Sequence, residues 1–267
     1  MRKAKVVIVF VLALTLLSAV TASAGPVIDR ILKKGVLAVG TSGQQPPLTV
    51  KNKAGKIIGL DADLSLLMAR SMGVDLKLVE MPFSELLPAL MAGKVDMVVS
   101  GMTITPQRNL KVAFVGPYYI SGKGILAKKE KASSFGDENR MNNPEFKLAA
   151  LKGSTSQMFV QQRIPKAKLI TPGTLDEALK LLFEDRVDAV VADVPYCVVT
   201  AFRYQDKGLA AGASPFTFEP LGVALPENDP LLANWVANIL GALQASGDLK
   251  RLAESWFKDS SWLRQLP

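Results

Sequence analysis

One short pattern occurs twice in this chain and constrains its fold more than any other feature. Residues 92–101 and residues 184–193 each combine a helix end, a tight turn and a buried apolar strand. Around both segments, further apolar strands alternate with stretches whose apolar residues fall at helical spacing. This alternation is typical of parallel sheets covered by helices. The sequence therefore predicts an α/β fold of two similar units, with Ser100-Gly101 and Ala192-Asp193 at matching strand ends.

The expected elements follow from the same spacing. The first unit has predicted strands at 36–39, 76–79 and 95–99, and helices over residues 60–72 and 84–91. The second unit has predicted strands at 147–151, 169–171 and 187–192, and helices that begin at 154, 174 and 194. Residues 130–146 are polar and predict a loop, and two last helices are expected from residues 230 and 248.

The first 24 residues are typical of a targeting segment rather than of folded structure. A basic start over residues 2–5 precedes an apolar run over 6–20, and Ala22-Ser23-Ala24 fits a signal-peptidase site. The run is too short for a membrane span. Residue 25 is Gly, so no cysteine stands there to carry a lipid. We therefore expect export to the periplasm without a lipid anchor.

The composition excludes several kinds of chemistry. The formal net charge is +8, but the lysines are scattered, which indicates a solvated surface rather than a nucleic-acid site. Cys197 is the only cysteine and stands in an apolar run, so we expect a buried thiol and no disulfide within the chain. The chain has no histidine, the commonest metal ligand and general base. We expect neither a metal nor a cofactor.

The stretch from Ser100 to Arg108 is the strongest candidate for a binding site. It follows a predicted strand, and Thr105-Pro106 is typical of a helix N-cap followed by proline at the first helical position. Free backbone N–H groups and the hydroxyls of Ser100 and Thr103 suit an anion. Arg108 offers a fork of donors that matches a carboxylate. The alternative is a strand, a turn and a surface arginine with no ligand.

The sequence Ser-Gly-Met-Thr-Ile-Thr-Pro-x-Arg at 100–108 resembles the signature of the polar amino-acid-binding proteins of ABC importers. The flanking segments 59–64 and 117–122 match the same family, and the resemblance covers nearly all of the chain after residue 24. It implies a two-lobed type II periplasmic-binding-protein fold, with mixed, mainly parallel sheets joined by a two-strand hinge. It also implies capture of a small zwitterion, most simply an amino acid, by hinge closure.

The same resemblance implies roles for residues on both lobes. In the family, Gly101, Thr103 and Arg108 would hold the ligand carboxylate from one side, and Thr155 in the turn with Ser154 would hold it from the other. Asp193 would pair with the ligand ammonium. The alternative for Ser154 and for Asp193 is an ordinary helix cap with no ligand. Phe83 would form one wall of the site, or it packs as a hydrophobic staple on the helix that follows it.

The predicted lobes are discontinuous. Residues 25–124 and 220–267 would form lobe 1, residues 125–219 would form lobe 2, and the crossings near 121–126 and 220–224 would be the hinge. The expected partners are a small-molecule ligand and the membrane permease of an ABC importer, with no nucleic acid. We expect a monomer.

Three functions are compatible with the resemblance: a receptor for the import of a small zwitterion, an enzyme on the same scaffold, and a ligand-sensing domain. The sequence favours the receptor. Cyclohexadienyl dehydratases resemble these binding proteins, but Gln157 stands where they carry a glutamate, and an amide cannot deliver a proton. A sensor domain is the third alternative. The loop 41–48 has Gln45 and Leu48 where relatives commonly carry aromatic residues. We therefore expect a small or polar uncharged amino acid to be preferred over a cationic one, with Gln44 or Gln45 bonding its side chain.

Overall fold

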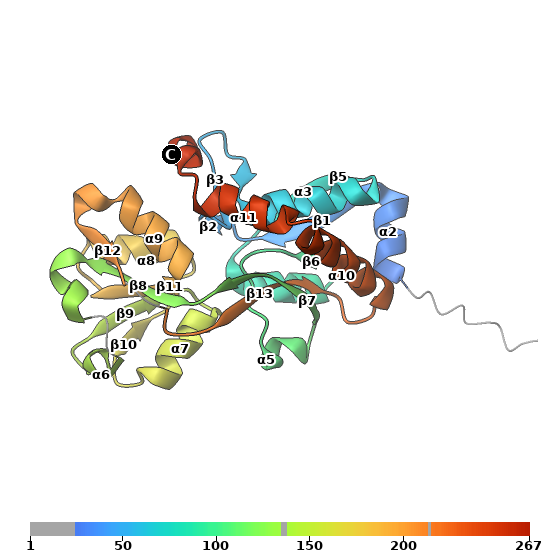
Figure 1. Ribbon diagram of the computed structural model, residues 1–267. Coiled ribbons are helices and arrows are strands. Elements are labelled where there is room, and N and C mark those ends of the chain that lie inside the picture. Colours follow the sequence, from blue (N-terminus) through green and yellow to red (C-terminus); the bar gives the residue numbers. More distant parts are fainter. Residues whose placement is uncertain (1–24, 135–137, 213–214) are drawn as a thin grey trace, which may run out of the picture.

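A computed structural model describes residues 25–134, 138–212 and 215–267. The predicted targeting segment, residues 1–24, lies outside these ranges. Two α/β lobes stand side by side and are joined by strands that pass between them (Figure 1). In the described ranges, no helix combines the length and the apolar character that a membrane crossing requires.

The first lobe is built on a five-stranded sheet in the order β5-β1-β6-β13-β7. Strands β5, β1 and β6 run parallel, and β13 pairs antiparallel with both β6 and β7. Helices α2, α3 and α10 pack on one face of this sheet and α4 on the other. The strands are β1 (Val36–Thr41), β5 (Asp75–Glu80), β6 (Met97–Val98), β7 (Ala113–Ser121) and β13 (Glu219–Leu225), and the helices are α2 (Pro26–Lys34), α3 (Leu60–Met72), α4 (Leu86–Met91) and α10 (Pro230–Ala245).

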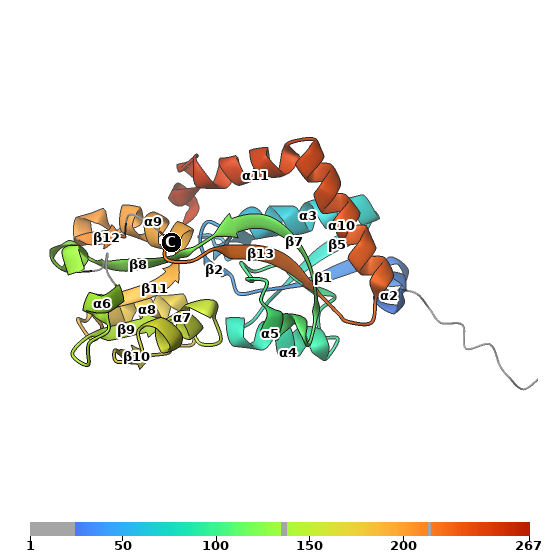
Figure 2. The same ribbon diagram turned by 60° about the horizontal axis from the view of Figure 1, so that its bottom comes forward.

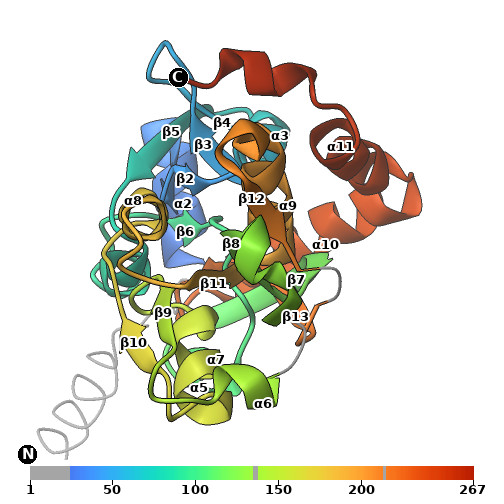
Figure 3. The same ribbon diagram turned by 90° about the vertical axis from the view of Figure 1, so that its left-hand side faces the viewer.

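The second lobe repeats this arrangement. Its sheet has the order β10-β9-β11-β8-β12, again with three parallel strands followed by two antiparallel ones. Helix α7 covers one face, and α8 and α9 cover the other (Figure 3). The elements are β8 (Lys123–Lys128), β9 (Lys147–Ala150), β10 (Lys168–Ile170), β11 (Ala189–Asp193), β12 (Leu209–Ala211), α7 (Thr155–Arg163), α8 (Leu175–Phe183) and α9 (Val194–Arg203).

The two segments that match in sequence also match in structure. Asp96 precedes β6, and its backbone N–H donates to the carbonyl of Ala38 while its carboxylate accepts the N–H of the same residue, both at 2.8 Å. Asp188 precedes β11 and makes the same pair of bonds with Lys147, at 2.7 and 2.9 Å. Because β6 and β11 hold the same place in their sheets, the predicted correspondence between the two units is confirmed.

The structure corrects two predicted elements. The strand expected over 95–99 is reduced to Met97–Val98, and just before its start the carboxylate of Asp96 accepts the N–H of Ala38 in place of a backbone carbonyl. The loop expected over 130–146 contains two short helices, the 3₁₀ helix Lys129–Ser134 and α6 (Glu138–Met141). Polarity alone did not reveal them, since helices this short need little apolar surface.

The chain crosses between the sheets at Gly122, which lies between β7 and β8, and returns before β13. The C-terminal helices then lie along the first lobe, and the chain ends beside α9 of the second (Figure 2). Trp262 and Leu266 pack with Val50 of the first lobe and Val199 of the second. The remaining elements are β2 (Gln44–Gln45), β3 (Thr49–Lys51), β4 (Ile57–Ile58), α5 (Pro106–Asn109), α11 (Asp248–Phe257) and 3₁₀ helices at Phe83–Glu85, Gln205–Lys207 and Ser261–Gln265.

Candidate functional site

The candidate site is an enclosed cavity between the lobes. Its volume is about 20 Å³, which is room for about one water molecule, so the lobes are closed on one another. Most of the predicted ligand-binding residues line it: Gln45, Phe83, Gly101, Thr103, Ser154, Thr155 and Asp193. Ser100 and Arg108 are the predicted residues that do not. Lys123, Leu151 and Leu175 also line the cavity and were not predicted.

The wall on the first lobe is the turn that begins at Ser100. Gly101 has a φ of +55°, and a Cβ there would lie 2.8 Å from the Gln45 side chain and 2.9 Å from Leu48, so the close packing requires glycine. The N–H of Gly101 donates to Asp61 at 2.8 Å, and the Tyr118 hydroxyl donates to the same carboxylate at 2.9 Å. Burial raises the pKa of Asp61 to about 7, although these two hydrogen bonds oppose the shift.

Ser100 supports this turn from behind. Its hydroxyl accepts the N–H of Ser42 at 2.9 Å and donates to the Ser42 hydroxyl at 3.2 Å, and the residue has no exposed surface. The predicted contact of Ser100 with a ligand stays a prediction. In the closed form, its hydroxyl ties the turn to the loop 41–48.

Arg108 lies where the lobes meet. The Thr105 hydroxyl caps α5 by accepting the Arg108 N–H at 3.2 Å, as the sequence predicts. The guanidinium donates to the carbonyl of Thr103 at 2.8 Å and to that of Gly153, on the second lobe, at 3.1 Å. It also lies 5.7 Å from the centre of the Phe83 ring. Burial lowers its pKa to about 10, which the carboxylates of Glu219 and Asp193 partly offset. Arg108 is therefore charged at neutral pH.

The wall on the second lobe is the start of α7. The Ser154 hydroxyl caps the helix by accepting the Gln157 N–H at 3.2 Å, and it donates to the carbonyl of Leu151 at 2.6 Å. Thr155 donates to Glu219 at 3.0 Å, and its hydroxyl lies 3.3 Å from that of Thr103. The two predicted hydroxyl clusters thus face one another across the interface between the lobes.

Asp193, at the end of β11, is the charged centre of the cavity. One of its oxygens accepts from Lys123 Nζ at 2.5 Å and the other from the Gln45 side-chain amide, on the first lobe, also at 2.5 Å. Lys123 Nζ lies 3.4 Å from Glu219. Burial raises the pKa of Glu219, but Lys123 and the hydroxyls of Thr103, Thr217 and Thr155 outweigh it, so the pKa lies below its ordinary value.

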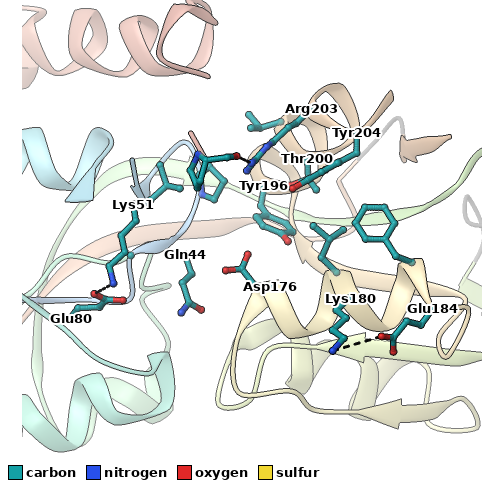
Figure 4. A pocket seen from close by; sticks show the side chains of 17 residues that line it. Gln44, Lys51, Glu80, Asp176, Lys180, Glu184, Tyr196, Thr200, Arg203 and Tyr204 are labelled. Atoms are coloured by element: carbon teal, nitrogen blue, oxygen red, sulfur yellow. Dashed lines mark hydrogen bonds and ion pairs between the residues drawn. The ribbon is translucent and has the colours of Figure 1, made fainter. Parts of the chain in front are cut away.

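A larger cavity of about 700 Å³ adjoins the first on the outer side of the interface (Figure 4). Asp176 of α8 lies between Gln44 and Tyr196, and burial raises its pKa. Ion pairs form two of the walls, Lys51 with Glu80 at 2.6 Å and Lys180 with Glu184 at 3.8 Å. Since the consecutive residues Gln44 and Gln45 line the two cavities, the larger one lies next to the enclosed site.

The donor set of the enclosed cavity is suited to an organic ion. It combines the carboxylate of Asp193, the ammonium of Lys123 and several hydroxyls, with the carboxylate of Glu219 and the guanidinium of Arg108 close by. In the residues that the structure describes, no group of three or more Asp, Glu, Cys or His side chains could hold a metal ion. Charged groups of both signs that converge from two lobes can bind a ligand that itself carries both signs.

Comparison with known proteins identifies the family. Residues 37–259 match the model of the bacterial extracellular solute-binding proteins, family 3. The chain belongs to this family. Among curated relatives, it is similar to the L-arginine-binding protein of Pseudomonas aeruginosa, with 30% identity over 233 residues that cover 82% of this chain and 86% of that protein. The family description places its members outside the cytoplasm.

Solved structures of the family share the fold. The binding component of an ABC transporter from Wolinella succinogenes, complexed with lysine, has a TM-score of 0.82 and 34% identity, covering 86% of this chain and 99% of that one. The ancestral amino acid-binding protein AncCDT-1, described as a precursor of cyclohexadienyl dehydratase, has a TM-score of 0.79 and 38% identity over the same shares. The predicted type II periplasmic-binding-protein fold is confirmed.

An enzyme is among the relatives. Cyclohexadienyl dehydratase of Pseudomonas aeruginosa is 23% identical over 231 residues, which cover 86% of each chain. In the present chain, Gln157 does not line the enclosed cavity, and its side-chain oxygen accepts the N–H of Gly153 at 2.8 Å. Other relatives are named as binding proteins for arginine or glutamine, which favours the receptor.

Proposed function

We propose that this protein is an extracytoplasmic receptor that captures an amino acid between its lobes and delivers it to an ABC importer. One observation carries the proposal: Arg108 and Asp193, from different lobes, meet at one interface with facing hydroxyl clusters. A guanidinium and a carboxylate on opposite sides are what a zwitterion requires. Relatives named for arginine and a structure complexed with lysine support the ligand class.

Protein groups satisfy one another's hydrogen bonds at this site in the closed form. The guanidinium of Arg108 donates to two backbone carbonyls, and an oxygen of Asp193 accepts from Gln45. In the proposed cycle, the lobes open by bending at the crossings between the sheets. The ligand carboxylate then takes the donors of Arg108 and Thr155, and its ammonium replaces the Gln45 amide at Asp193. The lobes then close around the ligand, which bridges them in place of these contacts.

The proposal includes the organisation predicted from the sequence. Residues 25–124 and 220–267 would move as one lobe and residues 125–219 as the other. The receptor would reach the periplasm after removal of residues 1–24 and would meet its permease as a monomer. It would be a receptor without catalytic activity.

A thermal-shift screen tests the proposed function. The protein is refolded after removal of any bound ligand and is then heated with each common amino acid in turn. A ligand at a hundredfold excess over its dissociation constant stabilises the folded state by about 2.7 kcal/mol. We expect at least one free amino acid to raise the melting temperature and its N-acetylated form to fail. If both forms compete equally, Asp193 does not receive an ammonium.

The alternative function is that of the dehydratase relative, and an assay for dehydratase activity distinguishes it from the receptor function. We expect purified protein to produce no phenylpyruvate from prephenate, because Gln157 cannot deliver a proton and is turned toward Gly153. Turnover above background would contradict the receptor proposal.

A further inference from the structure

Lys123 is the feature of the cavity that the proposed function leaves unexplained. It is the first residue of β8 and, with 1% of its surface exposed, is among the largest fully buried side chains. Its ammonium lies 2.5 Å from Asp193 and 3.4 Å from Glu219. A buried lysine is costly unless opposite charges pair with it, and here two carboxylates do so.

The backbone at the crossing holds this lysine in place. The N–H of Lys123 donates to the Thr217 hydroxyl at 3.0 Å, and its carbonyl accepts the N–H of Phe216 at 2.8 Å. A Cβ on the preceding residue, Gly122, would lie 2.5 Å from the carbonyl of Thr217, so the two crossing strands are in close contact. The side chain of Lys123 therefore enters the cavity from the crossing between the lobes.

The charges around the cavity balance because of this lysine. Asp193 and Glu219 supply two negative charges, and Lys123 and Arg108 supply two positive ones. A zwitterion adds no net charge to such a site. A second cation on the ligand, such as a guanidinium or a side-chain ammonium, would come close to the Lys123 ammonium, with which Asp193 and Glu219 are already paired. Like charges at short range in this environment repel strongly.

We propose that Lys123 is a specificity-determining residue that neutralises Asp193 and the neighbouring Glu219 and excludes amino acids with cationic side chains. This inference rests on the proposed function and narrows its ligand class to amino acids with uncharged side chains. It sets this chain apart from relatives that are named for arginine or were solved with lysine. The shared fold would then serve a different selectivity.

Titration calorimetry with arginine, lysine, glutamine and alanine tests the proposal on the ligand-stripped protein. We expect glutamine or alanine to bind at least tenfold more tightly than arginine and lysine. In Lys123→Met, the side chain keeps most of its length and loses its charge, so the cavity and its surroundings become net negative. The ratio of arginine to glutamine affinity should then rise at least tenfold.

Matched variants separate a charge effect from a structural one. In Lys123→Met with Glu219→Gln, the charges balance again, and the ratio should fall back toward that of the unmutated protein. Lys128 lies on the same strand and pairs with the exposed Asp185 at 2.6 Å, so Lys128→Met should leave the ratio unchanged. If Lys123→Met fails to fold, Glu219→Gln alone tests the idea. It removes a negative charge instead of a positive one, so it should lower the ratio of arginine to glutamine affinity.

The outcomes distinguish the inference from the proposed function. Tightest binding of arginine or lysine by the unmutated protein overturns the role of Lys123 while the receptor stands. An unchanged ratio in Lys123→Met, or in Glu219→Gln if the first variant does not fold, overturns it as well. Binding of no amino acid by the unmutated protein overturns the proposed function, and this inference with it.

Discussion

Two buried aspartates of this protein are held in opposite ways. Asp61 and Asp193 are 1% and 5% exposed. Asp61 accepts hydrogen bonds from the N–H of Gly101 and the hydroxyl of Tyr118, which are neutral donors within its own lobe. Asp193 accepts from the ammonium of Lys123 and from the amide of Gln45, which belongs to the other lobe. One carboxylate holds a turn within a lobe, and the other bonds across the interface.

Bonds within a lobe and bonds between lobes should contribute to different properties, the first to stability and the second to ligand binding. The bonds of Asp61 do not depend on whether the lobes are open or closed, so its loss should change the free energy of unfolding. The bond between Asp193 and Gln45 exists only when the lobes meet, so it can be exchanged for a ligand. Changes to contacts within a lobe should therefore alter unfolding, and changes to contacts between lobes should alter ligand affinity.

The largest effect is expected from Asp61→Ala. The substitution leaves two buried donors without an acceptor, the N–H of Gly101 and the hydroxyl of Tyr118, and each costs about 1–3 kcal/mol. We expect a loss of about 4 kcal/mol in the free energy of unfolding, measured with urea. Asp61→Asn is the control, because the oxygen of its amide can still accept from the N–H of Gly101. This variant should lose much less of the free energy of unfolding. A loss below about 1 kcal/mol in the alanine variant would contradict the role given to Asp61.

Arg108→Ala tests the contrasting contact between lobes. If the guanidinium binds the ligand carboxylate, affinity should fall roughly a hundredfold, or about 3 kcal/mol. Calorimetry measures this loss. Unfolding in the absence of ligand should change far less, because the Arg108 side chain is partly exposed at the edge of the interface. Unchanged affinity would show that the carboxylate binds elsewhere.

The pH dependence of stability gives the third test. The pKa of Asp61 is raised from 3.8 to about 7 by burial, so between these values the folded protein binds a proton that the unfolded chain has released. Asp61 therefore lowers the free energy of unfolding as pH rises from about 4 to about 7. The loss between pH 5 and 7 is about 2 kcal/mol. Asp61→Asn should remove this part of the dependence, which urea unfolding at several pH values can measure. An identical pH profile in the two proteins would refute the assignment.

The sequence predicts what depends on local pattern. The helix cap at Thr105, the cap at Ser154 and the strand that ends at Asp193 all form as expected. Other features depend on which segments meet in three dimensions. Ser100 bonds to Ser42 because the loop 41–48 packs behind the turn.

Lys123 was missed because a single lysine at the start of an apolar strand resembles a solvated strand end. Only the fold brings Asp193 and Glu219 to it, from positions 70 and 96 residues later in the chain. Phe83 shows the same limit, since its sequence context left two roles open. The structure places its ring in the cavity wall, beneath the Arg108 guanidinium.

The smallest effect is expected at the C-terminus, where the contrast between contacts within and between lobes can be measured on one segment. Arg203 of α9 donates to the carbonyl of Pro267 across the interface, whereas Lys53 of the first lobe donates to the carbonyl of Arg264 at 3.1 Å. Both contacts are exposed, so each contributes about 1 kcal/mol or less. Because the Arg203 contact forms only on closure, Arg203→Ala should weaken ligand binding up to fivefold in calorimetry. Lys53→Ala should leave affinity unchanged, since its contact persists when the lobes separate. Equal effects of the two substitutions would show that the end of the chain does not distinguish the open form from the closed one.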